Sequence, residues 1–563
     1  MNKNKLSANQ LFWILNIAWM LLNLLQASVT ELANDEAYYV VFAKHLDWGY
    51  YDHPPMIALF IYLGQWLSGE LGVRLLTVLS QPIYIWLLWK LIAPATVEKK
   101  DVWLFFIIAL AMPILHIYGF VAVPDAPLML FSALFLYFFV QYLQHTSWYY
   151  IPFMALAIAA IGYSKYTGVL VVLFACAAYP KVFLRKGIYI TATLSLLLML
   201  PHLYWQYQHE WVSFQYHLVG RNQDFNAFYI AEYVGNFIAV FNPFILPLVV
   251  WIGFKNRHQD KLTLLILKRI ALFFFLFFFA SCIRGHVQPQ WFIFVTFSVI
   301  ALVWQWARNH EKRYRYIRTV SIISIVILIG FRIVAATNPF GMKAEVFNNK
   351  TSYTQIANAT GNLPVIFMGK YTMAAKYSYY TGLDAHASPN IHFRTSQYQL
   401  WDFDSNLLEK PVAIHVGGDY PNATHIQTAN GQFSFVIDSC YMPIRKVQIQ
   451  WLNPYNTIAS KREEKNMTLS IHNPYPYDIV IDNEKIQLHY IIRKPWSWVE
   501  YFPVDVENPL ILTAFSTTNI QQKISIESEK AKPNETYETG FLLSKPPYIV
   551  WYNSPIYNIQ IVP

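Results

Sequence analysis

Long apolar stretches separated by short polar loops recur through the first three-fifths of the chain. An apolar run of about 20 residues is long enough to cross a membrane as a helix. This pattern therefore predicts a polytopic membrane protein with about 11 membrane-spanning helices. The predicted spans are 11–30, 75–94, 103–122, 126–143, 149–163, 166–180, 188–204, 230–254, 263–283, 289–307 and 319–336.

Two shorter elements lie between the first two spans. Residues 34–46 place Tyr38 or Tyr39 and Phe42 on one stripe, which predicts a helix lying along the membrane interface. Residues 56–68 are apolar but too few to cross a bilayer, so we expect a re-entrant or interfacial segment there.

The composition changes after about residue 337 to Asn, Tyr, Thr, Pro and charged residues, which predicts a second, soluble domain. VIFMG at 365–369 and VAIHVGG at 412–418 read as strands with a helical segment between them, as in α/β proteins. Later alternating strands separated by proline-containing turns favour a β-sandwich. We therefore expect a membrane domain at 1–337 and a soluble, mixed α/β to β-rich domain at 338–563.

Composition supports this division. The 563 residues are 55% hydrophobic and only 13% charged, as expected for a polytopic membrane protein. The net charge of +9 does not indicate a nucleic-acid partner, because Lys and Arg fall in short loops rather than on one soluble face. The three widely spaced cysteines predict neither a disulfide framework nor a metal cluster. No Walker loop, dinucleotide fingerprint or HExxH motif occurs.

The basic residues also predict the orientation in the membrane. Cytoplasmic loops carry an excess of Lys and Arg. We predict a cytoplasmic N-terminus, a retained first span, and a soluble domain on the external, periplasmic side of a bacterial inner membrane. The loops rich in Lys and Arg are 3–5, 90–100, 181–186, 255–269 and 308–318.

Two acidic residues, Asp35 and Glu36, stand at the start of the predicted helix 34–46. Acidic side chains at this place are stabilised by unpaired backbone N–H groups and by the helix dipole, so both are explained as first-turn acids. A carboxylate held in this way also stays ionised and fixed, as a catalytic base must be. The residues alone leave capping and catalysis open.

The same external loop closes with Asp52 and His53, followed by two prolines that force an extended entry into the next segment. These residues are explained as a solvated helix-start signal. A second acid and a histidine beside the aromatic residues 48–51 also suit a sugar-binding site.

The later external loops add further charges. Asp125 precedes the fourth span, where it acts as a helix cap or as another site acid. Lys165 lies between two short spans and either reaches lipid headgroups or meets a bound phosphate. Arg221 and Arg284 follow among histidines and tryptophans. Such a set suits a reaction in which an acid deprotonates an acceptor hydroxyl while cations stabilise a phosphate leaving group.

At these positions the chain resembles glycosyltransferase family 39, which contains the protein O-mannosyltransferases, and the lipid A aminoarabinose transferases. These families carry an Asp-Glu pair in the first external loop, matched by Asp35 and Glu36, and a closing Pro-Pro element, matched by 52–55. The resemblance covers roughly residues 10–340. It extends to Arg74, PDAPL at 124–128, SKYTGVL at 164–170, PHLYWQYQHEWVSF at 201–214 and FRTSQYQLW at 393–401.

The resemblance implies the GT-C fold and the inverting transfer of a sugar from a polyprenyl-phosphate carrier on the external face. It implies Asp35 as the general base and Glu36 as a residue that orients the base or the sugar. Because a phosphate leaves readily once its charge is matched, no general acid is required. His53 stands where the aminoarabinose enzymes have a lysine, which places more weight on the other cations.

The expected partners are a polyprenyl-phosphate-sugar donor, membrane lipids, and a lipid, glycan or protein acceptor. Metal use stays open, since Asp52 and a histidine suit a divalent cation but no ligand spacing requires one. The residues expected to hold the donor phosphate or substrate are Asp52, His53, Arg74, Asp125, Lys165, Arg221 and Arg284.

Three other functions compete with this one. A glycolipid transporter or flippase would use the polar residues to line a path. Transporters often show inverted repeats and charges within spans, whereas here the charges cluster in the predicted external loops and no repeat is apparent. A lipid-linked oligosaccharide ligase would need a long glycan donor. A sugar-binding envelope protein without catalysis would tolerate loss of the Asp35 carboxylate.

Overall fold

The computed structural model describes residues 6–220, 225–255, 262–459, 463–494, 497–506, 508–549 and 552–562. The chain divides into two compact units, Met1–Phe347 and Asn348–Pro563. The predicted boundary at residue 337 is the last residue of helix α16, and the segment 338–347 stays with the first unit.

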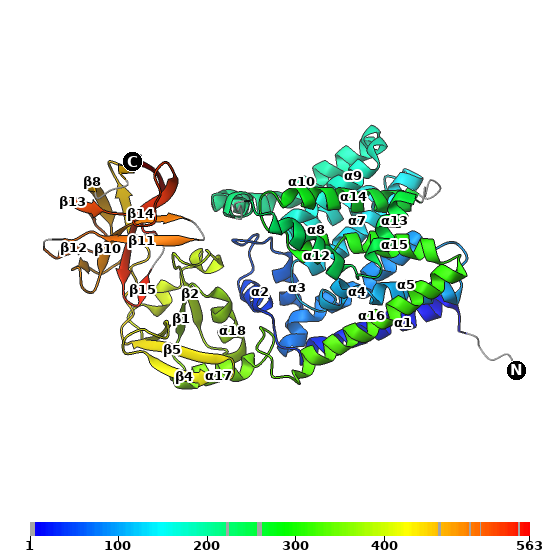
Figure 1. The fold of residues 1–563 in the computed structure, drawn as a ribbon, viewed down its shortest axis with the longest axis horizontal. Helices are drawn as coiled ribbons and strands as arrows, with labels where there is room; N and C mark the ends of the chain where they lie inside the picture. The colour runs from blue at the N-terminus through cyan, green and yellow to red at the C-terminus, as the bar shows by residue number, and fades with distance from the viewer. Residues whose placement is uncertain are drawn as a thin grey trace. The chain divides into compact units, whose positions relative to one another are not determined.

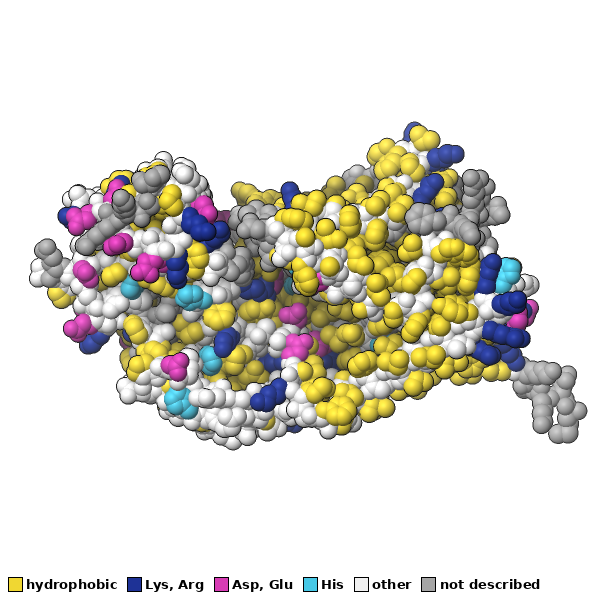
Figure 2. Space-filling model, viewed as in Figure 1, with side chains coloured by type: hydrophobic (Ala, Val, Ile, Leu, Met, Phe, Trp, Pro, Cys, Tyr) yellow, Lys and Arg dark blue, Asp and Glu magenta, His cyan; other side chains and the backbone are white. Residues whose placement is uncertain are grey.

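Unit 1 is helical (Figure 1), and its long helices carry many exposed apolar side chains (Figure 2). Within the described residues, six helices are long and apolar enough to cross a membrane. This arrangement confirms a polytopic membrane protein, whereas the number of crossings stays a prediction. The six helices are α1 (Ala8–Val29), α4 (Gly69–Ile92), α7 (Asp125–His145), α10 (Lys186–Gln208), α14 (Leu262–Ser281) and α16 (Glu311–Thr337). Shorter helices of the bundle are α8 (Tyr150–Ser164), α9 (Val169–Ala178), α12 (Phe228–Val240) and α15 (Val295–Ala307).

Two predicted spans are each broken into two helices. The span 103–122 becomes α5 (Lys99–Leu110) and α6 (Pro113–Ile117), because Pro113 has no N–H to continue the helix. The span 230–254 becomes α12 and α13 (Leu246–Lys255). At the second break Asn242 has a left-handed backbone (φ 73°), and its side-chain amide donates to the Ala111 carbonyl at 3.0 Å.

The predicted helix after the first span is present as α2 (Asn34–Lys44), followed by α3 (Met56–Gly64). Residues 36–43 of α2 are all buried, so the expectation of a single apolar stripe on an interfacial helix was wrong. The burial is explained by packing on both sides, including the Phe42 ring stacked on Tyr50 with centroids 4.1 Å apart. The turn from α3 to α4 is tight, because a Cβ at Gly72 would overlap the Leu67 carbonyl. Figure 1 shows α2 and α3 at the end of unit 1 opposite to the beginning of α1.

Unit 2 begins with an α/β layer. Its five-stranded sheet has the order β2-β1-β3-β5-β4, in which β1 is parallel to both β2 and β3. The two strands predicted from VIFMG and VAIHVGG are β1 and β3, whereas the short strand β2 was not predicted. The elements are α17 (Asn349–Ala359), β1 (Val365–Met368), α18 (Tyr371–Thr381), β2 (Ala385–Ser388), α19 (Asp404–Leu407), β3 (Val412–His415), β4 (Thr424–Thr428) and β5 (Gly431–Asp438).

The rest of unit 2 is built mainly from antiparallel strands, with one parallel pair between β16 and β7, in agreement with the predicted β-rich character. A six-stranded sheet, a three-stranded sheet and a two-stranded sheet share one apolar core that includes Trp451, Tyr490 and Phe541. The strands are β6 (Gln448–Trp451), β7 (Thr457–Ala459), β8 (Glu463–His472), β9 (Ile479–Ile481), β10 (Gln487–Lys494), β11 (Trp498–Pro503), β12 (Leu510–Leu512), β13 (Thr517–Ile526), β14 (Thr536–Lys545), β15 (Tyr548–Ile549) and β16 (Tyr557–Val562).

Candidate functional site

A buried ion pair ties the start of α2 to α4. The guanidinium of Arg74 donates to the two carboxylate oxygens of Glu36 at 2.7 and 2.5 Å. Its remaining N–H groups donate to the carbonyls of Ala27, Thr30 and Glu31, where α1 ends. Both side chains of the pair are fully buried. All five donors of Arg74 are therefore used inside the protein.

The carboxylate of Glu36 also has hydrogen-bond donors at both oxygens. Besides Arg74, it accepts the backbone N–H of Ala33 at 3.0 Å and of Ala122 at 2.8 Å. These four bonds fill its acceptor positions and leave no oxygen for a substrate. Glu36 was expected to orient the base or the sugar, and Arg74 to hold the donor phosphate; both roles stay predictions, and the bonds of the pair favour a positioning role. Both residues hold α2, α4 and the 118–125 loop together.

Asp35, the residue expected to be the base, is exposed beside this pair in the first turn of α2. Tyr118, which follows α6, lies close to it. The charges of both Asp125 and Asp35 act on the Tyr118 phenol, which places this tyrosine near the two carboxylates. Sequence reasoning missed this tyrosine, which sits among apolar residues without a motif of its own.

Asp125 and Lys165 form a second buried pair. The Lys165 amine donates to both oxygens of Asp125, at 2.8 and 2.9 Å. Asp125 begins α7, where its charge is stabilised by the helix dipole, and Lys165 ends α8. The two residues were predicted as members of one site, and the structure brings them into contact with each other.

The loop between α2 and α3 is clamped by residues from the end of α10. The His202 ring bonds the Trp48 carbonyl at 2.6 Å, and the Trp205 indole N–H donates to Asp47 at 2.8 Å. The Trp205 ring also packs against Gly49 so closely that no Cβ would fit there. The loop between α2 and α3 and the end of α10, far apart in the sequence, thus form one surface.

Asp52 and His53 lie on this clamped surface. The His217 ring bonds the Asp52 carbonyl at 2.8 Å, and the rings of His53 and His217 are 6.2 Å apart. The Asp52 side chain is buried, and its charge acts on the neighbouring Tyr166 phenol. The ring of Tyr166 lies 5.3 Å from that of His217. Tyr166 thus connects His217 with the buried Asp52.

Two predicted cations remain, Arg221 and Arg284. Arg221 lies outside the described residues. Arg284 is exposed in the turn after α14, and the nearby His286 ring pairs with Glu232 of α12 at 2.7 Å. This His286–Glu232 pair was also not predicted.

A second buried arginine, Arg332 of α16, was missed as well. It donates to Asn23 at 2.6 Å and to Gln26 at 3.3 Å, both on α1. The guanidinium groups of Arg332 and Arg74 both lie over the Phe120 ring, at 5.5 and 5.3 Å. A charge within an apolar span is costly and usually has a partner or a function, and this signal could have identified Arg332 from the sequence.

The part of the chain that the structure describes contains no cluster of three or more metal-ligating side chains. No three His, Cys, Asp or Glu side chains come together there in a way that could hold a metal ion. Metal use stays open, because Mg²⁺ is commonly held by one or two carboxylates together with waters and substrate phosphates.

Comparison with known proteins shows two likenesses. Residues 52–205 match the family model described as dolichyl-phosphate-mannose-protein mannosyltransferase. The fold is similar to crystal structures of ArnT from Cupriavidus metallidurans, in the apo state and bound to undecaprenyl phosphate. Each is 14% identical with a TM-score of 0.57, and the alignments cover 76% of this chain and 98% and 97% of those chains. No curated protein sequence matches significantly.

The predicted resemblance to GT-C glycosyltransferases is confirmed by these two findings. The chain is an integral membrane protein with the fold seen in ArnT. At this low identity the structural likeness shows the fold alone, so residue roles are proposed below from the geometry of this chain.

Proposed function

We propose that the protein is an inverting glycosyltransferase that takes its sugar from a polyprenyl-phosphate-linked donor. The observation that carries this proposal is the contrast between two adjacent acids. Glu36 is buried and saturated, whereas Asp35 is exposed beside it on a rigidly held helix end. A base needs this combination of accessibility and fixed position.

In the proposed reaction Asp35 removes the proton from the acceptor, a hydroxyl or phosphate group. The acceptor oxygen forms a bond to the anomeric carbon of the sugar as the bond to the polyprenyl phosphate breaks. The lipid phosphate leaves with the bonding electron pair. Attack from the face opposite the leaving group inverts the configuration at the anomeric carbon.

The leaving phosphate needs positive or hydrogen-bonding partners. With Arg74 fully engaged, the described residues that suit this role are His53 and Lys165. The Lys165 amine is held by Asp125, and the imidazole rings of His53 and His217 lie 6.2 Å from each other. The ArnT crystal structure contains undecaprenyl phosphate, which supports a polyprenyl phosphate as the lipid. Asp52, Arg221 and Arg284 stay candidates for contacts with the substrate.

A membrane assay tests the transfer. Membranes that contain the full chain are incubated with radiolabelled polyprenyl-phosphate sugars, and labelled product is measured for wild type and for Asp35→Asn. Loss of a general base lowers the rate by about 100-fold or more. Glu311→Gln, which removes an exposed carboxylate at the start of α16, serves as the matched control. Equal rates for wild type and Asp35→Asn would show that Asp35 is not the base.

The proposed orientation places unit 2 on the external face of a bacterial inner membrane. The cysteines provide a direct test, because Cys440 is exposed on unit 2 while Cys176 and Cys282 are buried. A membrane-impermeant maleimide should label Cys440 in intact spheroplasts, and Cys440→Ser should abolish labelling. Labelling only after lysis would place unit 2 in the cytoplasm.

A further inference from the structure

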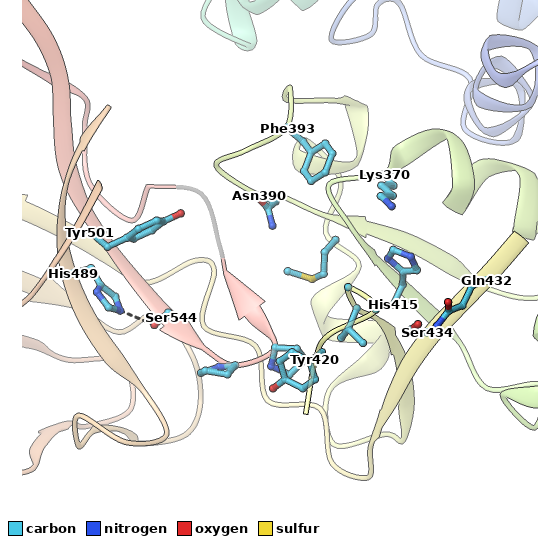
Figure 3. A pocket seen from close by; sticks show the side chains of 16 residues that line it. Lys370, Asn390, Phe393, His415, Tyr420, Gln432, Ser434, His489, Tyr501 and Ser544 are labelled. Atoms are coloured by element: carbon cyan, nitrogen blue, oxygen red, sulfur yellow. Dashed lines mark hydrogen bonds between the residues drawn. The ribbon is translucent and has the colours of Figure 1, made fainter. Parts of the chain in front are cut away.

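Unit 2 contains a cleft of about 830 Å³ that lies apart from the residues discussed above (Figure 3). It is lined by the carboxyl ends of β1 and β3, at Met368 and at His415 to Gly418. The chain runs from β1 through α18 to β2 on one side, whereas β3 pairs on the other side of β1. The cleft therefore lies where the strand order of a parallel sheet reverses, the usual place for a ligand in α/β proteins.

The turn between β1 and α18 forms one wall. Gly369 has a positive φ of 69°, and the Phe393 ring packs against it where a side chain would otherwise stand. Lys370 follows directly and lies at the N-terminal end of α18. Burial lowers the pKa of the Lys370 amine, which means that the cation has lost part of its water. An anionic group placed beside it would restore that lost stabilisation.

Neutral polar groups stand around this cation. His415 lies below Lys370 in Figure 3, and burial, with the Lys370 charge, lowers the pKa of its ring to about 4. The ring is therefore uncharged at neutral pH and can donate or accept one hydrogen bond. Asn390, Gln432 and Ser434 add amide and hydroxyl groups from neighbouring segments of the same layer.

The opposite wall comes from the β-sandwich. Tyr501 of β11 and His489 of β10 line the cleft together with Ser544 of β14. The His489 ring bonds the Ser544 hydroxyl at 2.8 Å, and Figure 3 shows both beside Tyr501. The Tyr501 hydroxyl is in turn bonded to His392 at 2.8 Å. Two kinds of structure within unit 2 thus contribute side chains to one cleft.

The side chains that line the cleft indicate the chemical class of its ligand. Among the described residues that line the cleft no side chain is a carboxylate, and Lys370 is the one cation, which faces neutral donors and acceptors. Three aromatic rings, those of Phe393, Tyr420 and Tyr501, offer flat apolar surfaces. A ligand with many hydroxyl groups, a flat apolar face and one negative charge would satisfy all of them.

We propose that this cleft binds a saccharide that carries one anionic group, a phosphate or a carboxylate. The anionic group lies at Lys370 and the N-terminal turn of α18. The sugar hydroxyls bond the amide, hydroxyl and imidazole groups of both walls, and an aromatic ring stacks on the sugar face. The choice of a saccharide rests on the proposed transferase function, in which unit 2 would hold a glycan near the membrane surface.

Binding to the full-length protein in detergent tests this proposal. The probes are glucose 1-phosphate, glucuronate and methyl glucoside, with affinities measured by saturation-transfer NMR. We expect both anionic sugars to bind, and the stronger of the two identifies the anionic group. Lys370→Gln removes a charge-assisted bond and should weaken their binding about tenfold, with methyl glucoside unaffected. Lys485→Gln, an exposed lysine in a turn of the sandwich, is the matched control.

Two aromatic variants test stacking. Tyr501→Phe keeps the ring and should retain binding within about threefold, whereas Tyr501→Ala should weaken it about tenfold. The same titrations on Asp35→Asn separate the two proposals: unchanged binding with no transfer supports both, and unchanged binding with full transfer rejects only the base. Equal binding of all probes by wild type and Lys370→Gln, or no binding of any probe, would overturn the saccharide site.

Discussion

Arg74 and Glu36 saturate each other: the guanidinium gives two bonds to the carboxylate and three to carbonyls at the end of α1. The carboxylate in turn accepts two backbone N–H groups that belong to different loops. The pair therefore fixes the start of α2, and with it the exposed carboxylate of Asp35.

Breaking this pair should destabilise unit 1 strongly. Glu36→Gln leaves the Arg74 charge buried without a carboxylate, and we expect a loss of about 3–5 kcal/mol in the free energy of unfolding. Arg74→Gln should cost a similar amount, and the double variant should cost less than the sum. Chemical unfolding in detergent measures all four proteins.

Activity distinguishes a positioning role from a catalytic one. If Glu36 acts by holding Asp35, Glu36→Gln should lower transfer in the wild-type background and have no further effect in Asp35→Asn. Its effect on unfolding should be the same in both backgrounds. A further loss of residual transfer in Asp35→Asn would mean that Glu36 takes part in the chemistry itself.

The stability of unit 1 should depend on which member of the Asp125–Lys165 pair carries the negative charge. Asp125 stands at the start of α7 and Lys165 at the end of α8, so each charge also interacts favourably with a helix dipole. The charge swap Asp125→Lys with Lys165→Asp restores the attraction but reverses both dipole interactions. We therefore expect the swap to stay about 1–2 kcal/mol less stable than wild type. Full recovery of unfolding free energy would show that the dipoles contribute nothing.

Stability of the α/β layer should fall on mild acidification because of His415. The unfolded histidine binds a proton below its ordinary pKa of 6.5, whereas the buried ring does so only below about 4. Stability is therefore lost as the pH falls from 6.5 towards 4, by roughly 2 kcal/mol at pH 5. Hydrogen-exchange protection of β3 in the full-length protein measures this loss. His415→Gln should flatten the dependence, and an unchanged slope would exclude His415 as its cause.

Sequence patterns predicted the architecture well because it depends on local features. Apolar runs of span length and the change of composition after residue 337 identified both units. The helix breaks at Pro113 and Asn242 were not predicted, because one polar residue or proline hardly alters the mean apolar character of a long run. Strand β2 was not predicted, because AHAS at 385–388 is short and lacks an apolar pattern, and its parallel pairing with β1 joins residues that are distant in the sequence.

Partner choice within the site could not be predicted in this way. Arg74 and Glu36 are 38 residues apart, and their contact depends on the tight turn between α3 and α4. The sequence shows that acids and cations share loops predicted to lie on one side of the membrane, but whether a cation meets a carboxylate or a phosphate is decided by packing. Asp125 and Lys165 are 40 residues apart, and their contact could not be predicted for the same reason.

The contact between Gly49 and Trp205 should control the loop that carries Asp52 and His53. A Cβ at Gly49 would lie under 3.0 Å from three ring carbons of Trp205. Gly49→Ala should therefore displace the indole from Asp47 and loosen the loop, and a shift of about 1 Å at a reacting group lowers rates by about 100-fold. In the Trp205→Phe background, which removes the outer ring, Gly49→Ala should have little further effect. Gly330→Ala, where a Cβ meets open space, is the control for helix propensity, and equal transfer by Gly49→Ala and wild type would contradict the clamp.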